Sequence, residues 1–345
     1  MPGSLRYRHF VGVDIAAKSA TVVIQSAADA VPSRPVVIEQ TPEGLARLHR
    51  ILGQGQAEPS ATLVVLEATG SSWITRATTL HHAGYAVSVI NPAQAHHFAK
   101  ALLRRSKTDA IDATTLARLA ATLQPEPWTP PPAVYHELQQ RLAQRDAWIG
   151  LRQQVRNQRH ALTQQPVIVA EVVARMDALI ATLDAQITEI EAELRPALAS
   201  DAAWDAAAHR LESIKGIGLV TALWILVTTL NFTMCPTPEA AAAYAGLAPR
   251  EDESGTSVRR RTCIGKTGNA RLRTALYMAT LSAAQSNPAI KTFYNRLRDA
   301  GKLQKVARCA AARKLLHVAW AVVVNERMWE PDDHQHHSAL AQSAA

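Results

Sequence analysis

The 345-residue chain has few or none of several features, and each shortage argues against a class of protein. Its three cysteines, Cys235, Cys263 and Cys309, lie far apart without a C-x-x-C pair, which argues against a disulfide framework and a zinc knuckle. No run of about 18 uninterrupted apolar residues occurs, so we expect no membrane span. The first residues lead into strand-like sequence without the apolar core of a signal peptide. These shortages together predict a cytoplasmic protein with reduced thiols.

Acidic residues are scarce in one long segment. Between Ser254 and Lys314 there are fourteen Lys or Arg residues and one acid, Asp299, so this segment carries about +13. The whole chain carries +8, which leaves about −5 for the remainder. Scattered solvating charge does not predict such segregation, whereas concentrated positive charge is typical of a surface that binds a phosphate backbone. We therefore expect a nucleic-acid partner.

The first part of the chain, residues 1–123, alternates short apolar runs with helical stretches. Strands are predicted at 10–16, 20–26, 34–40, 61–67 and 85–91. Helices are predicted after the cap residue Thr41, from about Ser72, from Pro92 and around Asp109. Three strands and a helix, followed by alternating strands and helices, is the element order of an RNase H-like (RuvC-like) α/β domain.

The middle of the chain is predicted to be a connector. A proline-rich linker at 124–133 precedes a helical region at 134–200. Five arginines of this region share one helix face and are candidate phosphate or RNA contacts: Arg141, Arg145, Arg152, Arg156 and Arg159. Beyond Pro166, six apolar residues are spaced four and three apart, as in a coiled-coil seam: Met176, Ile180, Leu183, Ile187, Ile190 and Leu194. Acids flank this seam, so we expect it to pair with protein, in an antiparallel hairpin or a dimer.

Four acids of the first part need a physical reason for their positions. Asp14 and Glu67 end otherwise apolar strands, where a carboxylate is costly unless it is paired, protonated or bound to a cation. Asp109 and Asp112 are three residues apart and so share one helix face. Four such acids can hold two Mg²⁺ ions and act on a phosphodiester. The alternative is an ordinary helix start, with Asp109 as the N-cap and Asp112 in the first turn.

The last part, 205–328, is predicted to be mainly α-helical, and 331–345 to be a disordered tail. Gly216 and Gly218, in "LESIKGIGLVTA", predict either a helix-hairpin-helix-like turn that binds phosphate or a plain helix–helix turn. Cations of the following glycine-rich segment are candidate nucleic-acid contacts: Arg259, Arg260, Arg261, Lys266, Arg271 and Arg273. Ser254 lies in the same segment, but no histidine base is adjacent, so spacing alone favours a loop or capping role.

Seven motifs in this order resemble a known family: "GVDIAAK", "LEATG", "NPAQAHHFAK", "RRSKTDAIDA", "IKGIG", "AYAGLAPREDESGTSVRRR" and "IGKTGNARLRTALYMAT". Over roughly residues 8–328 the chain looks like a DEDD-type insertion-sequence transposase, related to the Piv invertases. The resemblance implies an RuvC-like domain joined through a coiled coil to a C-terminal transposase domain. It also implies a bacterial site-specific recombinase, associated with the nucleoid when it acts. In this family a non-coding bridge RNA pairs with donor and target DNA, and dimers join into a tetramer.

The resemblance also assigns the residues of the site. The four acids of the family name fall on Asp14, Glu67, Asp109 and Asp112, and the nucleophilic serine falls on Ser254, with Ser257 as the competitor within the motif. It implies that Ser254 attacks phosphorus beside Mg²⁺ in a site that subunits can share.

Three cations precede the second pair of acids and would hold the adjoining nucleic-acid backbone: Arg104, Arg105 and Lys107. One alternative is a metal-dependent Holliday-junction resolvase or nuclease that uses the same acids and water, for which Ser254 is dispensable. Another is a non-catalytic nucleic-acid-binding descendant of a transposase, for which a lost metal ligand is expected.

Overall fold

The computed structural model describes residues 6–16, 18–29, 31–54, 58–68, 72–102, 108–250, 253–254, 258–259, 263–265 and 268–331. The chain forms two compact units, Met1–Pro130 and Pro131–Ala345. In the described ranges, no helix is both long enough and apolar enough to cross a membrane.

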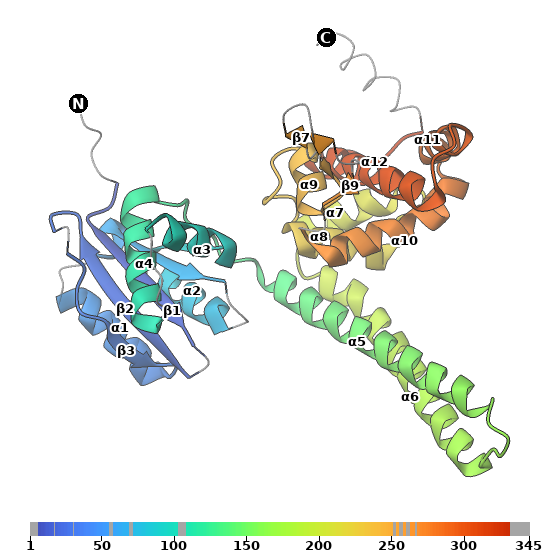
Figure 1. Ribbon diagram of the computed structural model, residues 1–345, viewed down its shortest axis with the longest axis horizontal. Helices are drawn as coiled ribbons and strands as arrows, with labels where there is room; N and C mark the ends of the chain where they lie inside the picture. The colour runs from blue at the N-terminus through green and yellow to red at the C-terminus, as the bar shows by residue number, and fades with distance from the viewer. Residues whose placement is uncertain are drawn as a thin grey trace, which may run out of the picture. The chain divides into compact units, whose positions relative to one another are not determined.

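A five-stranded mixed sheet forms the centre of the first unit, in the order β3-β2-β1-β4-β5 (Figure 1). Strand β1 is antiparallel to β2, and β2 to β3, whereas β4 is parallel to both β1 and β5. The strands are β1 His9–Ile15, β2 Ser19–Ser26, β3 Val36–Glu39, β4 Thr62–Glu67 and β5 Ala86–Ile90. They match the five predicted runs, with small shifts at their ends.

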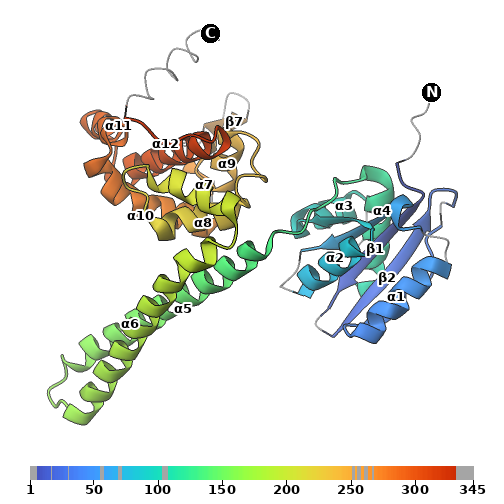
Figure 2. The same cartoon turned by 180° about the vertical axis from the view of Figure 1, so that it is seen from behind.

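Helices cover both faces of this sheet, because the central strands are apolar on both faces. Figures 1 and 2 show α4 on one face and α1 and α2 on the other. The helical elements are α1 Pro42–Gln54, the 3₁₀ turn η1 Pro59–Ala61, α2 Ser72–His82, α3 Pro92–Ala101 and α4 Asp109–Leu123. Two starts follow the local signals. The Thr41 hydroxyl accepts from the Gly44 amide at 3.1 Å, and the Asn91 side chain caps the helix that opens at Pro92.

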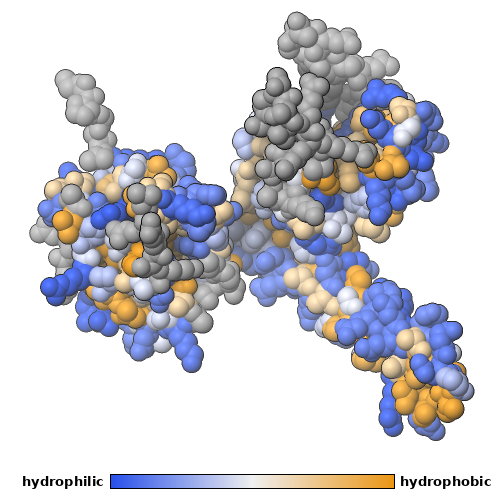
Figure 3. Space-filling model, in the orientation of Figure 1, coloured by the Kyte–Doolittle hydropathy of each residue, from blue (hydrophilic) through white to orange (hydrophobic). Residues whose placement is uncertain are grey.

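An antiparallel pair of long helices, α5 Ala133–Leu162 and α6 Ala170–Leu198, begins the second unit (Figure 2). The predicted seam of α6 is buried from Leu183 to Leu194 and half-buried at Met176 and Ile180. Apolar residues at the turn between the helices remain exposed: Val167, Ile168 and Val169 are 77%, 48% and 50% exposed. Figure 3 shows hydrophobic residues gathered at this end of the hairpin.

Six shorter helices make up the rest of the described second unit, and the residues of α8 from Ala222 to Val227 are all buried. They are α7 Ala202–Glu212, α8 Leu219–Thr229, α9 Pro238–Tyr244, α10 Ala270–Ser286, α11 Pro288–Asp299 and α12 Gln304–Val324. The base of the hairpin joins the same core through Leu138, Leu142 and Leu194. The structure therefore has an α/β first unit and a mainly α-helical second unit, as predicted.

The described residues between α9 and α10 include four two-residue strands. They are β6 Pro249–Arg250, β7 Glu253–Ser254, β8 Val258–Arg259 and β9 Cys263–Ile264. Strand β6 pairs with β9, and β7 pairs with β8, both antiparallel. The β7–β8 pair lies, in the sequence, between the two strands of the β6–β9 pair.

Candidate active site

Helix α4 lies directly on the central strand β1, and Gly12 makes this close approach possible. A Cβ atom on Gly12 would lie 2.1 Å from the carbonyl oxygen of Ala113 and 2.3 Å from the amide nitrogen of Ala117. Two residues earlier on the strand, Phe10 belongs to the cluster that contains Leu119. Later residues of β1 thus contact earlier residues of α4, so the helix and the strand run antiparallel.

This direction places the start of α4 beside Asp14. Side chains alternate along a strand, so Asp14 projects to the same face as Gly12, which is the face covered by α4. Two strand residues span about 6.6 Å, and a helix covers that distance in about four residues. The helix segment beside Asp14 is therefore centred about four residues before the segment that contacts Gly12. The segment beside Asp14 is therefore the first turn of α4, which carries Asp112.

Glu67 lies on the same face of the next strand. Residues Leu63 and Val65 of β4 pack in the cluster on the α4 side, and Glu67 has the same parity. Strand β4 is parallel to β1, with Val13 opposite Leu66, so the next positions on the two strands are Asp14 and Glu67. Two strand ends and a helix start thus bring three acids to one end of one sheet face.

Helix α4 is capped by Thr108, one residue before Asp109, which the ordinary-helix alternative gave as the N-cap. Its hydroxyl accepts a hydrogen bond from the Ile111 amide at 3.3 Å, so Asp109 as the N-cap is wrong. Asp109 and Asp112 instead occupy the first turn, where the positive end of the helix dipole stabilises carboxylates. Asp109 is exposed, whereas Asp112 is half-buried like Asp14 and Glu67.

The donor chemistry of these acids fits a hard divalent cation. Carboxylate oxygens are the ligands of Mg²⁺, and neither histidine nor cysteine would be needed. Each of Asp14, Glu67 and Asp112 takes part in an interaction within the chain. Across the ranges that the structure describes, no three acid, His or Cys side chains already form a group that could hold a metal ion.

Several predicted contacts of the site lie outside the described residues. These are Arg104, Arg105 and Lys107 before α4, and Ser257, Arg260, Arg261 and Lys266 in the second unit. Ser254 is described through its backbone: it is the second residue of β7 and pairs with Val258 of β8. Arg259, in β8, pairs with Glu253 in the same way.

The five arginines of the α5 stripe have carboxylate partners on α6. Nitrogen–oxygen distances are 2.5–3.2 Å for the pairs Arg141–Glu193, Arg145–Glu191, Arg152–Asp184, Arg156–Asp184 and Arg159–Asp177. Rising numbers on α5 meet falling numbers on α6, as an antiparallel hairpin requires. The hydrogen bond from Arg152 lowers the pKa of Asp184, and the hydrogen bond from Arg159 lowers that of Asp177. The stripe therefore helps to set the register of the hairpin, and contact with phosphate or RNA stays a prediction.

Two further predicted cations also have partners inside the second unit. Arg271 is ion-paired with Asp146 of α5, and its guanidinium carbon lies 4.2 Å from the ring centre of Trp224. Burial lowers the pKa of Arg271, although the nearby Asp146 opposes this change. Arg273 donates to the carbonyl oxygen of Ala245 at 2.9 Å. Both side chains thus join helices to one another.

The glycine turn between α7 and α8 is held against α10. Gly216 has φ of +103°, and a Cβ atom there would lie 2.5 Å from the Cβ of Ala283. The side-chain Nδ2 of Asn287 donates to the carbonyl oxygen of Lys215 at 3.2 Å. Gly218, by contrast, is the N-cap of α8 with open space around it. Packing explains Gly216, and phosphate binding at this turn stays a prediction.

Motifs in the sequence did not single out four cations that line one pocket of the second unit. They are Arg296, Lys305, Arg313 and Lys314, on α11 and α12. The only sequence signal for them was the excess of positive charge between Ser254 and Lys314. That signal gives no grouping, because the four residues come together only when α11 packs on α12.

Comparison with known families places both halves of the chain in one group of proteins. Residues 11–166 match a transposase family of the DEDD type named for IS110, and residues 208–295 match the transposase IS116/IS110/IS902 family. The chain is 31% identical over 275 residues to the pilin gene-inverting protein of Moraxella lacunata, which covers 79% of this chain and 83% of that protein. It is 32% identical over 174 residues to an uncharacterized 43.6 kDa protein of insertion element IS110 from Streptomyces coelicolor, covering 49% of this chain and 42% of that protein.

The first match contains the four acids, and the second match contains Ser254. Similarity to a pilin gene-inverting protein extends over most of both chains. The chain therefore belongs to the IS110/IS116 family of DEDD-type transposases, which are enzymes of DNA recombination.

Proposed function

We propose that this transposase cuts and rejoins DNA through a serine nucleophile, beside Mg²⁺ held by acids of the first unit, with a bridge RNA as its guide. DEDD transposases generally depend on a divalent metal. The observation that carries the proposal is the placement of Asp14, Glu67 and Asp112 at one end of one sheet face. The proposed function is therefore that of a site-specific recombinase of an insertion sequence.

The fold of each unit supports this assignment. The strand order β3-β2-β1-β4-β5, with three antiparallel strands followed by two parallel ones, fits an RNase H-like domain of the RuvC type. The α5–α6 hairpin fits the coiled-coil connector, and residues 205–328 are the proposed transposase domain.

The acids of the first unit are the proposed metal ligands. Asp14, Glu67, Asp109 and Asp112 would hold two ions through carboxylate oxygens. When bound, Mg²⁺ would neutralise charge on the scissile phosphate. The chain's own part is to position these oxygens: β1 and β4 are fixed in the centre of the sheet, and Gly12 lets α4 lie against them.

The proposed reaction conserves the number of phosphodiester bonds. The Ser254 hydroxyl loses its proton and attacks phosphorus, so an Oγ–P bond forms while the P–O bond to the departing strand breaks. The departing oxygen takes up a proton. The hydroxyl at the end of another strand then attacks the phosphoserine, and the Ser254 oxygen leaves with a proton. Cations that precede Asp109 and Asp112, or follow Ser254, in the sequence would hold the flanking phosphates: Arg104, Arg105, Lys107, Arg259, Arg260, Arg261 and Lys266.

The proposed partners are donor and target DNA, the bridge RNA, and further copies of the chain. The positive charge between Ser254 and Lys314 supports a polyanionic partner. The exposed apolar turn at 167–169 supports association of copies, because such a patch is costly in water.

A covalent-adduct assay tests this function. The purified chain is mixed with its element's flanking RNA, Mg²⁺ and end-labelled target DNA, and the label is followed through denaturation. We expect the label to stay with the wild-type protein and with Ser257→Ala, and to be lost with Ser254→Ala. Cleaved DNA without an adduct, unchanged in Ser254→Ala, would mean that water is the nucleophile and the protein a nuclease.

A second set of variants tests the acids. Asp112→Asn is expected to lower strand cleavage at least about 100-fold, because loss of even an indirect metal partner costs about 10–100-fold. Asp29→Asn is the matched control, since Asp29 is an exposed acid of the same unit outside the proposed site. Full cleavage by Asp112→Asn would remove it from the metal site.

A further inference from the structure

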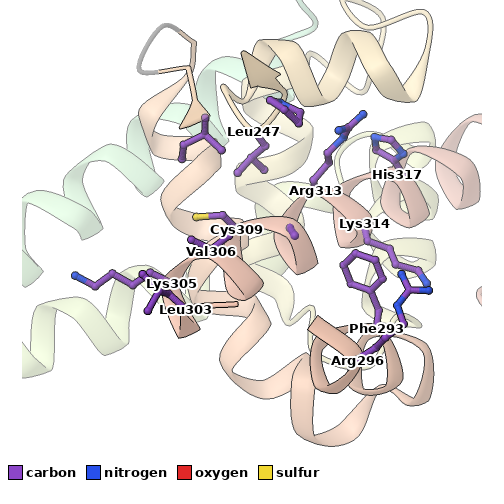
Figure 4. Close-up of a pocket in the computed structure, with 13 residues that line it drawn as sticks. Leu247, Phe293, Arg296, Leu303, Lys305, Val306, Cys309, Arg313, Lys314 and His317 are labelled. Atoms are coloured by element: carbon purple, nitrogen blue, oxygen red, sulfur yellow. The ribbon is translucent and has the colours of Figure 1, made fainter. Parts of the chain in front are cut away.

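A pocket of about 940 Å³ in the second unit combines an apolar lining with cations (Figure 4). It lies between α11 and α12 and reaches Pro249 and Ile264, in the paired strands β6 and β9 that enclose Ser254 in the sequence. Its apolar wall includes Leu247, Phe293, Leu303 and Val306. Figure 4 shows Arg313, Lys314 and His317 along α12, with Phe293 and Arg296 opposite them on α11. The described residues that line the pocket include no acid.

The pocket cations differ from those of the α5 stripe in their partners. Arg296, Lys305, Arg313 and Lys314 form no ion pair with a carboxylate of any described residue, whereas each stripe arginine does. Burial lowers the pKa of Lys314, and the nearby Arg296 lowers it further. Like charges held together without a partner destabilise the folded chain, and a bound anion removes that repulsion. A negatively charged ligand would therefore be stabilised in this pocket.

An aromatic ring stands among these cations. The guanidinium carbon of Arg296 lies 5.3 Å from the ring centre of Phe293, and the Lys314 nitrogen lies 5.0 Å from it. The lining of a smaller hollow of about 310 Å³ also includes these three residues. Aromatic rings beside cations are typical of surfaces that bind single-stranded nucleic acid, where bases contact the ring and phosphates contact the cations.

A polar group in the pocket also lacks a partner. The Nε2 atom of His317 is buried and forms no hydrogen bond with the part of the chain that the structure describes. Burial, followed by the nearby Arg313, lowers the pKa of His317, and the opposing effect of Glu239 is smaller, so the ring is neutral near pH 7. A neutral ring nitrogen can pair with the edge of a base, whereas an apolar helix from a protein partner would leave it unpaired.

We propose that this pocket binds an unpaired nucleotide of the nucleic-acid substrate or guide. The base lies in the apolar part against Phe293, its edge faces His317, and the adjoining phosphates lie on Arg296, Lys305, Arg313 and Lys314. The proposal rests on the proposed function in one respect, that the chain binds DNA and RNA strands. A strand held here lies beside β6 and β9, between which Ser254 lies in the sequence.

Binding of short strands to the full-length protein tests this site. Anisotropy of labelled ten-nucleotide RNA, DNA of the same sequence, the matching DNA duplex and a fully abasic DNA strand is measured in EDTA, so that no chemistry occurs. Lys305→Gln/Lys314→Gln is compared with Lys291→Gln/Lys302→Gln, which removes the same charge from exposed positions outside the pocket. Phe293→Leu keeps an apolar side chain and removes the ring.

We expect the pocket pair to weaken single-strand binding about tenfold more than the control pair. Loss of two phosphate contacts should reduce the slope of log affinity against log salt by about 1.4. Phe293→Leu should weaken binding of strands with bases about tenfold, because an aromatic contact to a base is worth about 1–3 kcal/mol, and should leave the abasic strand unaffected. The nucleic acid, RNA or DNA, whose affinity falls more in Lys305→Gln/Lys314→Gln is the source of the nucleotide.

Equal losses in the two lysine pairs would overturn the proposal, because general charge would then explain binding. Equal effects of Phe293→Leu on normal and abasic strands would overturn the placement of a base. Unchanged strand affinity with an altered sedimentation coefficient would also overturn it, and would assign the pocket to a second copy of the chain. Ser254→Ala, expected to bind strands like the wild type, separates the two proposals: loss of the adduct chemistry alone leaves the pocket standing.

Discussion

Replacement of Gly12 by alanine would place a methyl group between β1 and α4. The new Cβ atom would lie 2.1 Å from the Ala113 carbonyl oxygen, and an ordinary contact begins at 3.4 Å, so the backbones must separate by about 1.3 Å. Strand β1 is held on both sides by β2 and β4, so the helix has to move. Both contacted atoms belong to the backbone of α4, and no side-chain rotation can relieve the overlap.

The expected cost is about 2 kcal/mol in the free energy of unfolding. Overpacking of a core costs about 1–3 kcal/mol. Alanine also lowers the conformational entropy of the unfolded chain, which offsets about 0.4–1 kcal/mol of that cost. Since the contacts are severe, we place the overpacking cost at the upper end of that range. Because α4 carries Asp112, a shift of about 1 Å should also lower metal-dependent strand cleavage about 100-fold.

Urea denaturation and cleavage of labelled DNA in Mg²⁺ measure the two effects on Gly12→Ala. Gly53→Ala is the matched control, because no described atom outside its own helix backbone and chain neighbours lies within 4 Å of its Cβ position, and the residue is exposed in α1. Alanine there should stabilise the helix by up to about 1 kcal/mol and leave cleavage unchanged. An unchanged stability of Gly12→Ala would refute the close packing of α4 on β1. A lower stability with full cleavage would refute the role of α4 in placing the acids.

Two further predictions concern ion pairs of the second unit. The lowered pKa of Asp184 means that its pair with Arg152 stabilises the hairpin fully above the ordinary carboxyl pKa of 3.8, and that this stabilisation disappears as the pH falls through the lowered value. An NMR titration of the Asp184 carboxyl carbon should show a midpoint below 3.8 that rises in Arg152→Gln, and an unshifted wild-type midpoint would contradict the pair. Asp146→Asn should lower the free energy of unfolding, measured in urea, by about 1–2 kcal/mol, because it leaves the part-buried Arg271 without its carboxylate. This value is smaller than the about 3–5 kcal/mol of a fully buried pair, since both side chains are about a third exposed. A change below about 0.5 kcal/mol would mean that solvent already screens this pair.

Local patterns in the sequence located the helices and the five sheet strands of the first unit. Short apolar runs located the five strands of the sheet, and Thr41 and Pro92 located two helix starts. These signals act over a few residues, through alternation of side chains and through capping of free amides. The cap of α4 was misplaced by one residue, because Thr108 and Asp109 are both good capping residues and only the geometry selects between them.

The spacing of charges was visible in the sequence, but the partners of those charges were not. One helix face of α5 carries five arginines, and acids flank the seam of α6, so either nucleic acid or the neighbouring helix could have paired with the stripe. The hairpin brings the two helices together and pairs all five. Pairing across tens of residues depends on which helix faces meet, and no local pattern encodes that.

The sequence by itself determined the two-part organisation, the residue types of the site and the segregation of positive charge, because each of these depends on composition and short-range periodicity. Only the tertiary structure decided that α4 runs antiparallel to β1, which brings Asp112 to the face of Asp14 and Glu67. It also decided that Arg296 and Lys314 stand beside Phe293 in one pocket while the stripe of α5 is neutralised. Both outcomes depend on the packing of distant elements, which sets the partner of each exposed or buried charge.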